Sequence, residues 1–231
     1  MNTNQSEEIK LWRYIDWGKL KSLLQDRAIF FPRASKFIDE GATPKANRKE
    51  RFFAELEREN FRRCLADYTY ISCWHMNEHE SNAMWQIYAD NKKGFAIKTT
   101  DSRLKRSLDY HKFIVMGPIK YIDFERDENP GHQGSSITPF FYKDLMYKSE
   151  DEFRAVIYDG PSQEVLDGAA PSNPFVGMSI PVDLNVLVER IVVGPSYTNE
   201  TFDDVLMLVK DTFKGDSSKV EISKMCKKPK Y

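Results

Sequence analysis

The stretch from residue 68 to residue 99 constrains the fold of this chain more than any other. Two runs with strand-like composition, residues 68–74 and 94–99, enclose a segment whose side chains recur at helical spacing: Met84, Trp85, Tyr88 and Ala89. Aromatic side chains that carry a polar group serve both a packed core and a ligand site. The stretch therefore predicts the centre of a β-sheet and, as a hypothesis, one wall of a cleft.

Length and composition favour a single globular domain across residues 1–231, with a polar leader at residues 1–8 and a basic tail at residues 224–231. Hydrophobic residues make up 41% of the chain and aromatic residues 13%, which is too rich for a disordered protein. No apolar run approaches the roughly 18 residues that a membrane helix needs. We therefore expect a globular protein with no membrane partner.

Charge and cysteine content narrow the functional classes. The 34 basic and 35 acidic residues give a net charge of -1, so we expect no general affinity for nucleic acid. The three cysteines, Cys64, Cys73 and Cys226, are an odd number without the spacing of a disulfide framework. Reduced thiols, and hence a cytoplasmic location, are expected.

The remaining pattern alternates between strands and helices without an internal repeat. Strands are expected at residues 11–15, 28–32, 113–116, 119–124, 151–158, 175–180, 190–193 and 219–223. Helices are expected after an N-cap at Asp16, at residues 48–66, 101–108 and 138–147, and after a cap at Thr198 or Asn199. This order predicts an α+β fold with a mixed, mostly antiparallel central sheet flanked by helices.

Two carboxylates in the second half of the chain are candidates for acid–base chemistry. Glu150 and Glu152 are two residues apart, and on a strand they would point to the same face. Like charges this close can raise one pKa and create a hydrogen-bonding pair. The more ordinary interpretation is a salt-bridge ladder with Lys148 and Arg154.

Arg13 and Ser72 are further candidates. Arg13 lies between Trp12 and Tyr14 in a predicted strand, where a guanidinium can pair bidentately with a phosphate or a carboxylate. Alternatively, it stacks on its aromatic neighbours. Ser72 follows Ile71 in another predicted strand and could orient a second polar side chain. Alternatively, it is a small buried residue bonded to the backbone.

Metal and nucleotide motifs are weak. His75 and His79 are four residues apart and close to Cys73, but no second cluster follows at ligand spacing, so no metal site is predicted. The glycines form neither a P-loop nor a dinucleotide-binding fingerprint.

Several segments together resemble the prokaryotic and phage family called domain of unknown function 2971. They read LWRY, AIFFPRASKFID, YISCWH, MWQIYADNKKGFAI, EDEFR and IVVGPS, and the fourth is the most specific. The chain departs from the family at residues 37–40, where Phe-Ile-Asp-Glu replaces the usual Phe-Asn-Asp-Pro. Members often lie near defence or toxin genes, so the resemblance implies a role in a phage or in bacterial defence.

The order of Arg13, Ser72 and Glu152 along three predicted strands is also similar to the Arg–Ser–Glu class of ADP-ribosyltransferases. The resemblance implies that Arg13 holds NAD, that Ser72 steadies Glu152, and that Glu152 bonds the nicotinamide ribose while Glu150 orients the acceptor. It also places Tyr14, Ser72, Trp85 and Tyr88 at the NAD site, with Trp85 or Tyr88 as a stacking wall. The serine motif departs from the usual Ser-Thr-Ser, because Cys73 follows Ser72.

Three hypotheses follow from these patterns. The first is an NAD-dependent mono-ADP-ribosyltransferase, a toxin or phage effector acting on an unknown macromolecular acceptor, which requires Arg13, Ser72 and Glu152 to converge on one cleft. The alternative is a non-catalytic sensor or interaction module of a defence or phage system, which requires an exposed Glu152 paired with Lys148 or Arg154. The third is a metal-dependent nuclease in which Asp39, Glu150 and Glu152 hold Mg²⁺. The sequence does not identify the acceptor or the oligomeric state.

Overall fold

A computed structural model describes residues 8–36, 64–108, 114–124, 126–127, 137–161, 173 and 175–226. The chain divides into two compact units. Unit 1 takes residues 1–29, 74–110 and 180–231, and unit 2 takes residues 30–73 and 111–179. The prediction of one domain across the chain stays a prediction.

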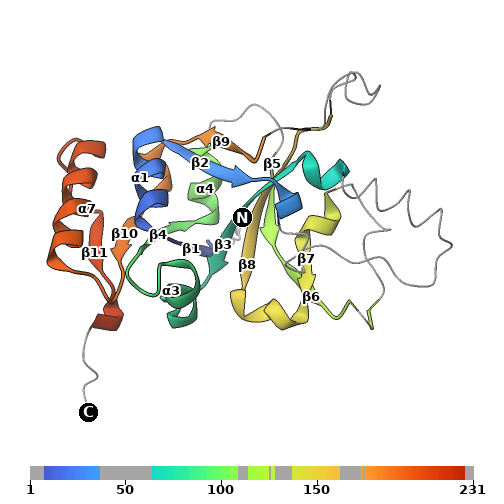
Figure 1. The fold of residues 1–231 in the computed structure, drawn as a ribbon, viewed down its shortest axis with the longest axis horizontal. Coiled ribbons are helices and arrows are strands. Elements are labelled where there is room, and N and C mark those ends of the chain that lie inside the picture. The colour runs from blue at the N-terminus through green and yellow to red at the C-terminus, as the bar shows by residue number, and fades with distance from the viewer. Residues whose placement is uncertain are drawn as a thin grey trace, which may run out of the picture. The chain divides into compact units, whose positions relative to one another are not determined.

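The strands of the main sheet follow the hydrogen-bonded order β11-β10-β4-β1-β3-β8-β5 (Figure 1). Strand β3 (Thr69–Met76) contains residues of both units. The pairs β1–β3, β1–β4, β4–β10 and β5–β8 are antiparallel, and β10–β11 is parallel. The predicted fold class, a mixed and mostly antiparallel sheet flanked by helices, is confirmed.

Unit 1 contains most of the helices in the described residues. Its strands are β1 (Lys10–Ile15), β4 (Phe95–Thr100), β10 (Arg190–Val193) and β11 (Val220–Ile222). Its helices are α1 (Trp17–Asp26), α3 (Asn82–Tyr88), α4 (Asp101–Ser107), α6 (Leu184–Leu187), α7 (Asn199–Thr212) and the short 3-10 helix η5 (Lys224–Cys226). Helix α1 packs against α7, and α4 packs against α6.

Unit 2 is built around strand β8 (Glu152–Tyr158), which pairs with β5 (Ile114–Pro118). Strands β6 (Lys120–Ile122) and β7 (Tyr142–Asp144) form a small parallel sheet beside two 3-10 helices, η3 (Thr138–Phe141) and η4 (Leu145–Glu150). Two further strands, β2 (Ala28–Pro32) and β9 (Gly177–Pro181), pair with each other and contain residues of both units.

Alternation along β1 builds the aromatic core of unit 1. Trp12 and Tyr14 point to one face of the strand because side chains alternate with a period of two. They join a buried cluster with Met84 and Trp85 of α3, together with Ala89, Ala96 and Val192. Helix α3 therefore packs its apolar face on β1, as the helical spacing in this segment predicts.

Local signals locate several element boundaries. Asp16 caps α1 by accepting a hydrogen bond from the Lys19 backbone N–H at 2.9 Å, and Thr198 caps α7 in the same way. Strands β2 and β10 have the predicted bounds, residues 28–32 and 190–193. These predictions are confirmed.

Other predictions are wrong in detail. The stretch at residues 68–99 forms β3 and β4, which lie in the interior of the sheet as predicted, but the middle strand between them is β1. The helix expected at residues 138–147 is instead η3, β7 and the first part of η4. The chain becomes extended at Tyr142, an aromatic residue of a type that favours strands. Residues 48–63 of another predicted helix lie outside the described residues.

No helix in the described parts is long and apolar enough to cross a membrane.

A strained turn follows α3 and returns the chain to β4. Asp90, Asn91 and Lys92 have backbone φ angles of 45°, 50° and 73°. Residues that carry a Cβ atom rarely adopt these positive values. Backbone hydrogen bonds hold the turn, including one from Lys92 N–H to the Trp85 carbonyl at 3.0 Å. A Cβ on Gly94 would lie 2.3 Å from the Ile15 carbonyl oxygen, so the chain approaches β1 too closely for any other residue. This close packing fixes the turn and with it the end of α3.

Replacing Lys92 with glycine should stabilise the protein by about 1 kcal/mol, because glycine adopts a positive φ without the steric penalty that lysine carries. Chemical denaturation measures this change. Lys93→Gly is the matched control, since Lys93 is not among the residues with positive φ, and it should destabilise the protein. Equal effects of both substitutions would show that the strain at Lys92 does not matter.

Candidate functional site

The candidate catalytic carboxylate, Glu152, is the first residue of β8 and is only 3% exposed. Arg154 lies two residues later on the same face of the strand and is 2% exposed. Its Nε donates to Glu152 Oε1 at 2.6 Å, and its Nη2 donates to Glu152 Oε2 at 3.1 Å. Such a two-point pair holds both side chains in one orientation.

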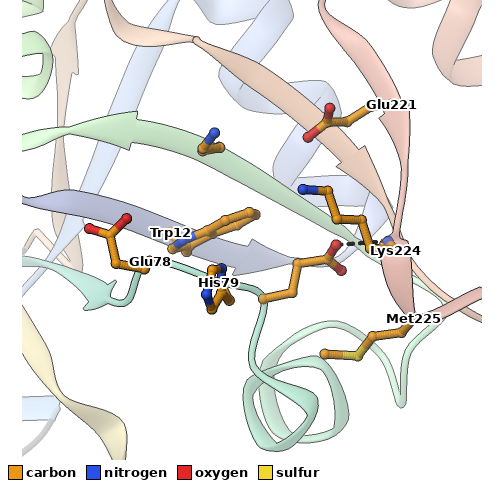
Figure 2. Close-up of a pocket in the computed structure, with 8 residues that line it drawn as sticks. Trp12, Glu78, His79, Glu221, Lys224 and Met225 are labelled. Atoms are coloured by element: carbon orange, nitrogen blue, oxygen red, sulfur yellow. Dashed lines mark hydrogen bonds between the residues drawn. The ribbon is translucent and has the colours of Figure 1, made fainter.

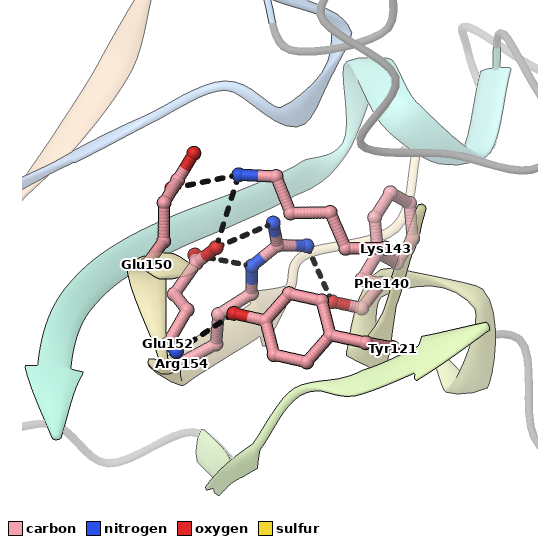
Figure 3. Close-up of polar contacts among 6 residues, drawn as sticks. All are labelled: Tyr121, Phe140, Lys143, Glu150, Glu152 and Arg154. Atoms are coloured by element: carbon pink, nitrogen blue, oxygen red, sulfur yellow. Dashed lines mark hydrogen bonds and ion pairs between the residues drawn. The ribbon is translucent and has the colours of Figure 1, made fainter. Parts of the chain in front are cut away.

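Lys143 and Glu150 extend this pair into a network (Figure 3). Lys143, on β7, places its Nζ 2.9 Å from Glu150 Oε2 and 3.4 Å from Glu152 Oε2. Arg154 Nη1 donates to the Phe140 carbonyl at 2.7 Å, and the Glu152 backbone N–H donates to the Tyr121 hydroxyl at 2.8 Å. We call these side chains the Glu152 network: Tyr121, Lys143, Glu150, Glu152 and Arg154. Its two carboxylates and two cations balance.

Glu150 reaches the network by a different route from the one that the sequence predicts. It ends η4 and does not lie on β8, and Asp151 turns the chain between them with a φ of 38°. The predicted shared strand face is therefore wrong. The two glutamates meet because Lys143 binds both, and Lys143 is a residue that the sequence patterns did not single out.

Burial and charge act in opposite directions on Glu152. Burial alone would raise the pKa of its carboxyl, but the charge and hydrogen bonds of Arg154 and the charge of Lys143 outweigh burial and hold the pKa below its ordinary value. Glu152 is therefore ionised at neutral pH. Burial, and next the negative charge of Glu152, raise the pKa of the Cys73 thiol, which stays protonated.

Cys73, and not Ser72, is the β3 residue that meets Glu152. The Cys73 thiol hydrogen-bonds the Glu152 side chain. Ser72 is fully buried, and as the preceding strand residue it points to the opposite face of β3. The expectation that Ser72 steadies Glu152 is therefore not supported by this geometry, and Cys73 takes that position.

Four of the residues expected at the NAD site lie in unit 1, and the fifth, Ser72, lies in unit 2. The Arg13 guanidinium lies over the Trp74 ring, 5.5 Å from its centroid. Tyr14 points to the other face of β1, where its ring meets Trp85 edge-on at 5.0 Å. Trp85 is fully buried, so neither face of its ring is open to a ligand in this structure, whereas Tyr88 is 44% exposed.

The structure brings two pairs of the predicted site residues into contact. It brings Glu150 to Glu152, and Tyr14 to Trp85. Arg13, Tyr14, Trp85 and Tyr88 belong to unit 1, whereas Ser72, Glu150 and Glu152 belong to unit 2. Convergence of Arg13 and Glu152 on one cleft stays a prediction.

The nuclease hypothesis requires Asp39, Glu150 and Glu152 to hold Mg²⁺ together. Glu150 and Glu152 both contact the Lys143 ammonium, and Asp39 lies outside the described residues. Within the described parts of the chain, no group of three or more His, Cys, Asp and Glu side chains could hold a metal ion.

Comparison with known proteins gives little beyond this geometry. No protein family matches the sequence, and no curated protein is similar to it. Among solved structures, DarT from Thermus sp. 2.9 in complex with NAD+ aligns with 97% of this chain and 98% of its own, with a TM-score of 0.41 and 11% sequence identity.

Replacing Glu152 with glutamine should lower the free energy of unfolding by about 3–5 kcal/mol, because it leaves the buried Arg154 guanidinium without its counter-charge. Glu150→Gln is the matched control and should cost about 1 kcal/mol or less, since Glu150 is more exposed than Glu152 and Lys143 keeps Glu152 as a partner when the charge of Glu150 is removed. Chemical denaturation of both variants measures the difference. Similar losses would show that the Glu152–Arg154 pair does not dominate the network.

The lowered pKa of Glu152 also predicts a pH dependence. The stability contributed by its ionised form is present above the ordinary pKa of 4.5 and is lost as the pH falls through the lower native value. The free energy of unfolding should therefore decrease on acidification below about pH 4.5. In the double variant Glu152→Gln/Arg154→Met this decrease should be smaller, while other carboxyls with lowered pKa, such as Asp16 and Asp216, contribute equally in both proteins. Identical pH profiles would contradict this assignment.

Proposed function

We propose that this chain is an NAD-dependent ADP-ribosyltransferase and that Glu152 is its catalytic carboxylate. The observation that carries the proposal is a buried glutamate that stays ionised because Arg154 and Lys143 surround it. A fixed negative charge in a desolvated setting stabilises developing positive charge more strongly than one in water.

The proposed reaction requires such a charge. The bond between nicotinamide and the ribose breaks, nicotinamide leaves with the bonding electron pair, and C1′ of the ribose develops oxocarbenium character. An acceptor nucleophile then bonds to C1′ and loses its proton. A carboxylate that accepts a hydrogen bond from a ribose hydroxyl supports this centre, as in other glycosyl transfers. Glu152 has this role in the proposal, and Glu150 orients the acceptor.

Substrate binding in this scheme requires one contact to open, and the network contains a suitable one. Lys143 lies 3.4 Å from Glu152 but 2.9 Å from Glu150, so its ammonium already has a nearer partner. If Lys143 moves fully to Glu150, Glu152 Oε2 becomes available to a ribose hydroxyl. Arg154 remains in place and keeps Glu152 oriented and ionised.

The proposal adjusts the roles that the family resemblance implies. Cys73 replaces Ser72 as the group that hydrogen-bonds Glu152. Contact with NAD is assigned to Arg13 and to the exposed ring of Tyr88. Tyr14 and Trp85, which are buried in the core of unit 1, support these residues from behind. A macromolecular acceptor and a role as a toxin or phage effector belong to the same proposal.

A second candidate function has its own supporting observation. Both carboxylate oxygens of Glu152 are already engaged by cations. The sequence predicts an exposed Glu152 for this alternative and is wrong on that point, because Glu152 is buried, but the pairing with Arg154 is as predicted. A network whose charges are all paired can also serve only to hold the fold together, in which case the chain is a non-catalytic sensor or interaction module. The two candidates differ in whether NAD binds and is consumed.

Calorimetry with NAD and measurement of nicotinamide release test the proposal directly. The wild type should bind NAD at or below about 1 mM and release nicotinamide. Arg13→Ala should weaken binding, and Glu152→Gln should lower release by about 100-fold or more while binding persists. Glu189→Gln, which removes an ion pair of unit 1 with Lys98, is the control and should retain both properties.

Loss of stability in Glu152→Gln must be separated from loss of catalysis. All variants are therefore assayed at a temperature at which a thermal scan shows each of them folded. Absence of saturable heat from the wild type at NAD concentrations well above about 1 mM would overturn the transferase proposal in favour of the interaction module. Full activity of folded Glu152→Gln would remove Glu152 from the catalytic role.

A further inference from the structure

A pocket of about 280 Å³ opens in unit 1 (Figure 2), and none of its lining residues belongs to the Glu152 network. Its lining residues come from β1, from the loop between β3 and α3, from β4, and from the chain around β11 and η5: Trp12, Glu78, His79, Glu80, Lys98, Glu221, Lys224 and Met225. None of the roles assigned above uses this pocket. Its volume suits a ligand of a few heavy atoms.

Glu80 fixes the wall that η5 contributes. Its Oε1 accepts a hydrogen bond from the Lys224 backbone N–H at 2.8 Å, and its Oε2 accepts from Trp85 Nε1 at 3.0 Å and from the Ser223 hydroxyl. The loop after β3, helix α3 and the segment that carries Lys224 and Met225 are thus joined at one carboxylate. The pocket is a built feature of the fold and not a gap between loose surface side chains.

The lining keeps an excess negative charge after the ion pairs that its residues form with neighbouring residues are counted. Glu78 pairs with Lys10 at 2.6 Å, and Lys98 pairs with Glu189 at 2.9 Å, so both are neutralised by residues outside the lining. Glu80 keeps its charge, because its three donors are neutral groups. Among the described residues Glu221 and Lys224 have no ion-pair partner. With histidine counted as neutral, two carboxylates and one ammonium remain, a net charge of -1.

The aromatic wall also favours a cation. The negative face of an indole ring attracts ammonium groups, and the Trp12 ring already has the Lys98 ammonium 5.9 Å from its centroid. Trp12 is held in place because its Nε1 donates to the Asn77 carbonyl at 2.8 Å. Met225 adds a flexible apolar contact on the opposite wall.

From the residual charge, the indole wall and the volume, we propose that this pocket binds a small organic monocation, an ammonium group on a short apolar chain. Glu221 is the carboxylate that pairs with the ammonium, Trp12 and Met225 contact the apolar chain, and Lys224 opposes the positive charge. This inference does not depend on the proposed transferase activity, because none of the residues that line the pocket has a role in that activity.

The four tryptophans of the chain allow a direct test on the full-length protein. Their indole N–H signals in a ¹H–¹⁵N spectrum are assigned by single Trp→Phe substitutions, and n-butylammonium is titrated into the wild type. The Trp12 signal should shift saturably with a Kd tighter than about 10 mM, while the signal of Trp17, which packs on Phe95, stays in place. The neutral n-butanol and the anionic butyrate are matched probes and should not produce this shift.

Two charge variants should move the affinity in opposite directions. Glu221→Gln should weaken butylammonium binding about three- to five-fold, and Lys224→Gln should strengthen it by a similar factor. Glu200→Gln, on the exposed first turn of α7, should have no effect. An equal response to butanol, a preference for butyrate, no saturable shift of Trp12, or equal affinities of the two pocket variants would each overturn the proposal.

Discussion

The buried ion pair between Glu152 and Arg154 is the interaction on which the rest of unit 2 depends. Two charges removed from water are stable only if every remaining hydrogen-bonding group finds a partner. Arg154 meets this demand by donating to the Phe140 carbonyl, and Glu152 meets it through Lys143 and Cys73. Strand β8 thereby binds η3 through the Phe140 carbonyl and β7 through the Lys143 ammonium.

Local structure could be predicted from this sequence where the signal is local. Helix α1 begins after the capping residue Asp16, and helix α7 begins after the capping residue Thr198. Strand β10 is specified by its own short apolar run. The order of strands could not be predicted in this way, because it depends on pairings between distant segments. The segment at residues 68–99 contains two interior strands, but β1, which lies more than fifty positions earlier in the chain, lies between them.

The site shows the same limit at the level of single side chains. Alternation along β3 means that Ser72 and Cys73 face opposite sides, but it does not say which side Glu152 occupies. The resemblance to Arg–Ser–Glu enzymes favours Ser72, whereas the fold places the Cys73 thiol there. Lys143 was missed for a related reason. It precedes Glu150 by seven residues, which is two turns along a helix and opposite faces of a strand, so neither regular structure would bring the two side chains together. It reaches both glutamates because η4 follows β7 directly.

Glu80 in unit 1 is partly buried and Glu152 in unit 2 is buried, and the two carboxylates have different kinds of partner. This difference bears on function. Glu152 is neutralised by cations, so a ligand must first displace one of them, and the barrier to that exchange would limit any reaction at this site. Glu80 binds three neutral donors, so its charge persists and contributes to the field of the pocket beside it. A ligand that responds to this field needs no rearrangement of the protein. Binding at the pocket should therefore be fast and should leave the protein conformation unchanged. Catalysis at Glu152, in contrast, would require Lys143 to give up its contact with Glu152 and to remain with Glu150.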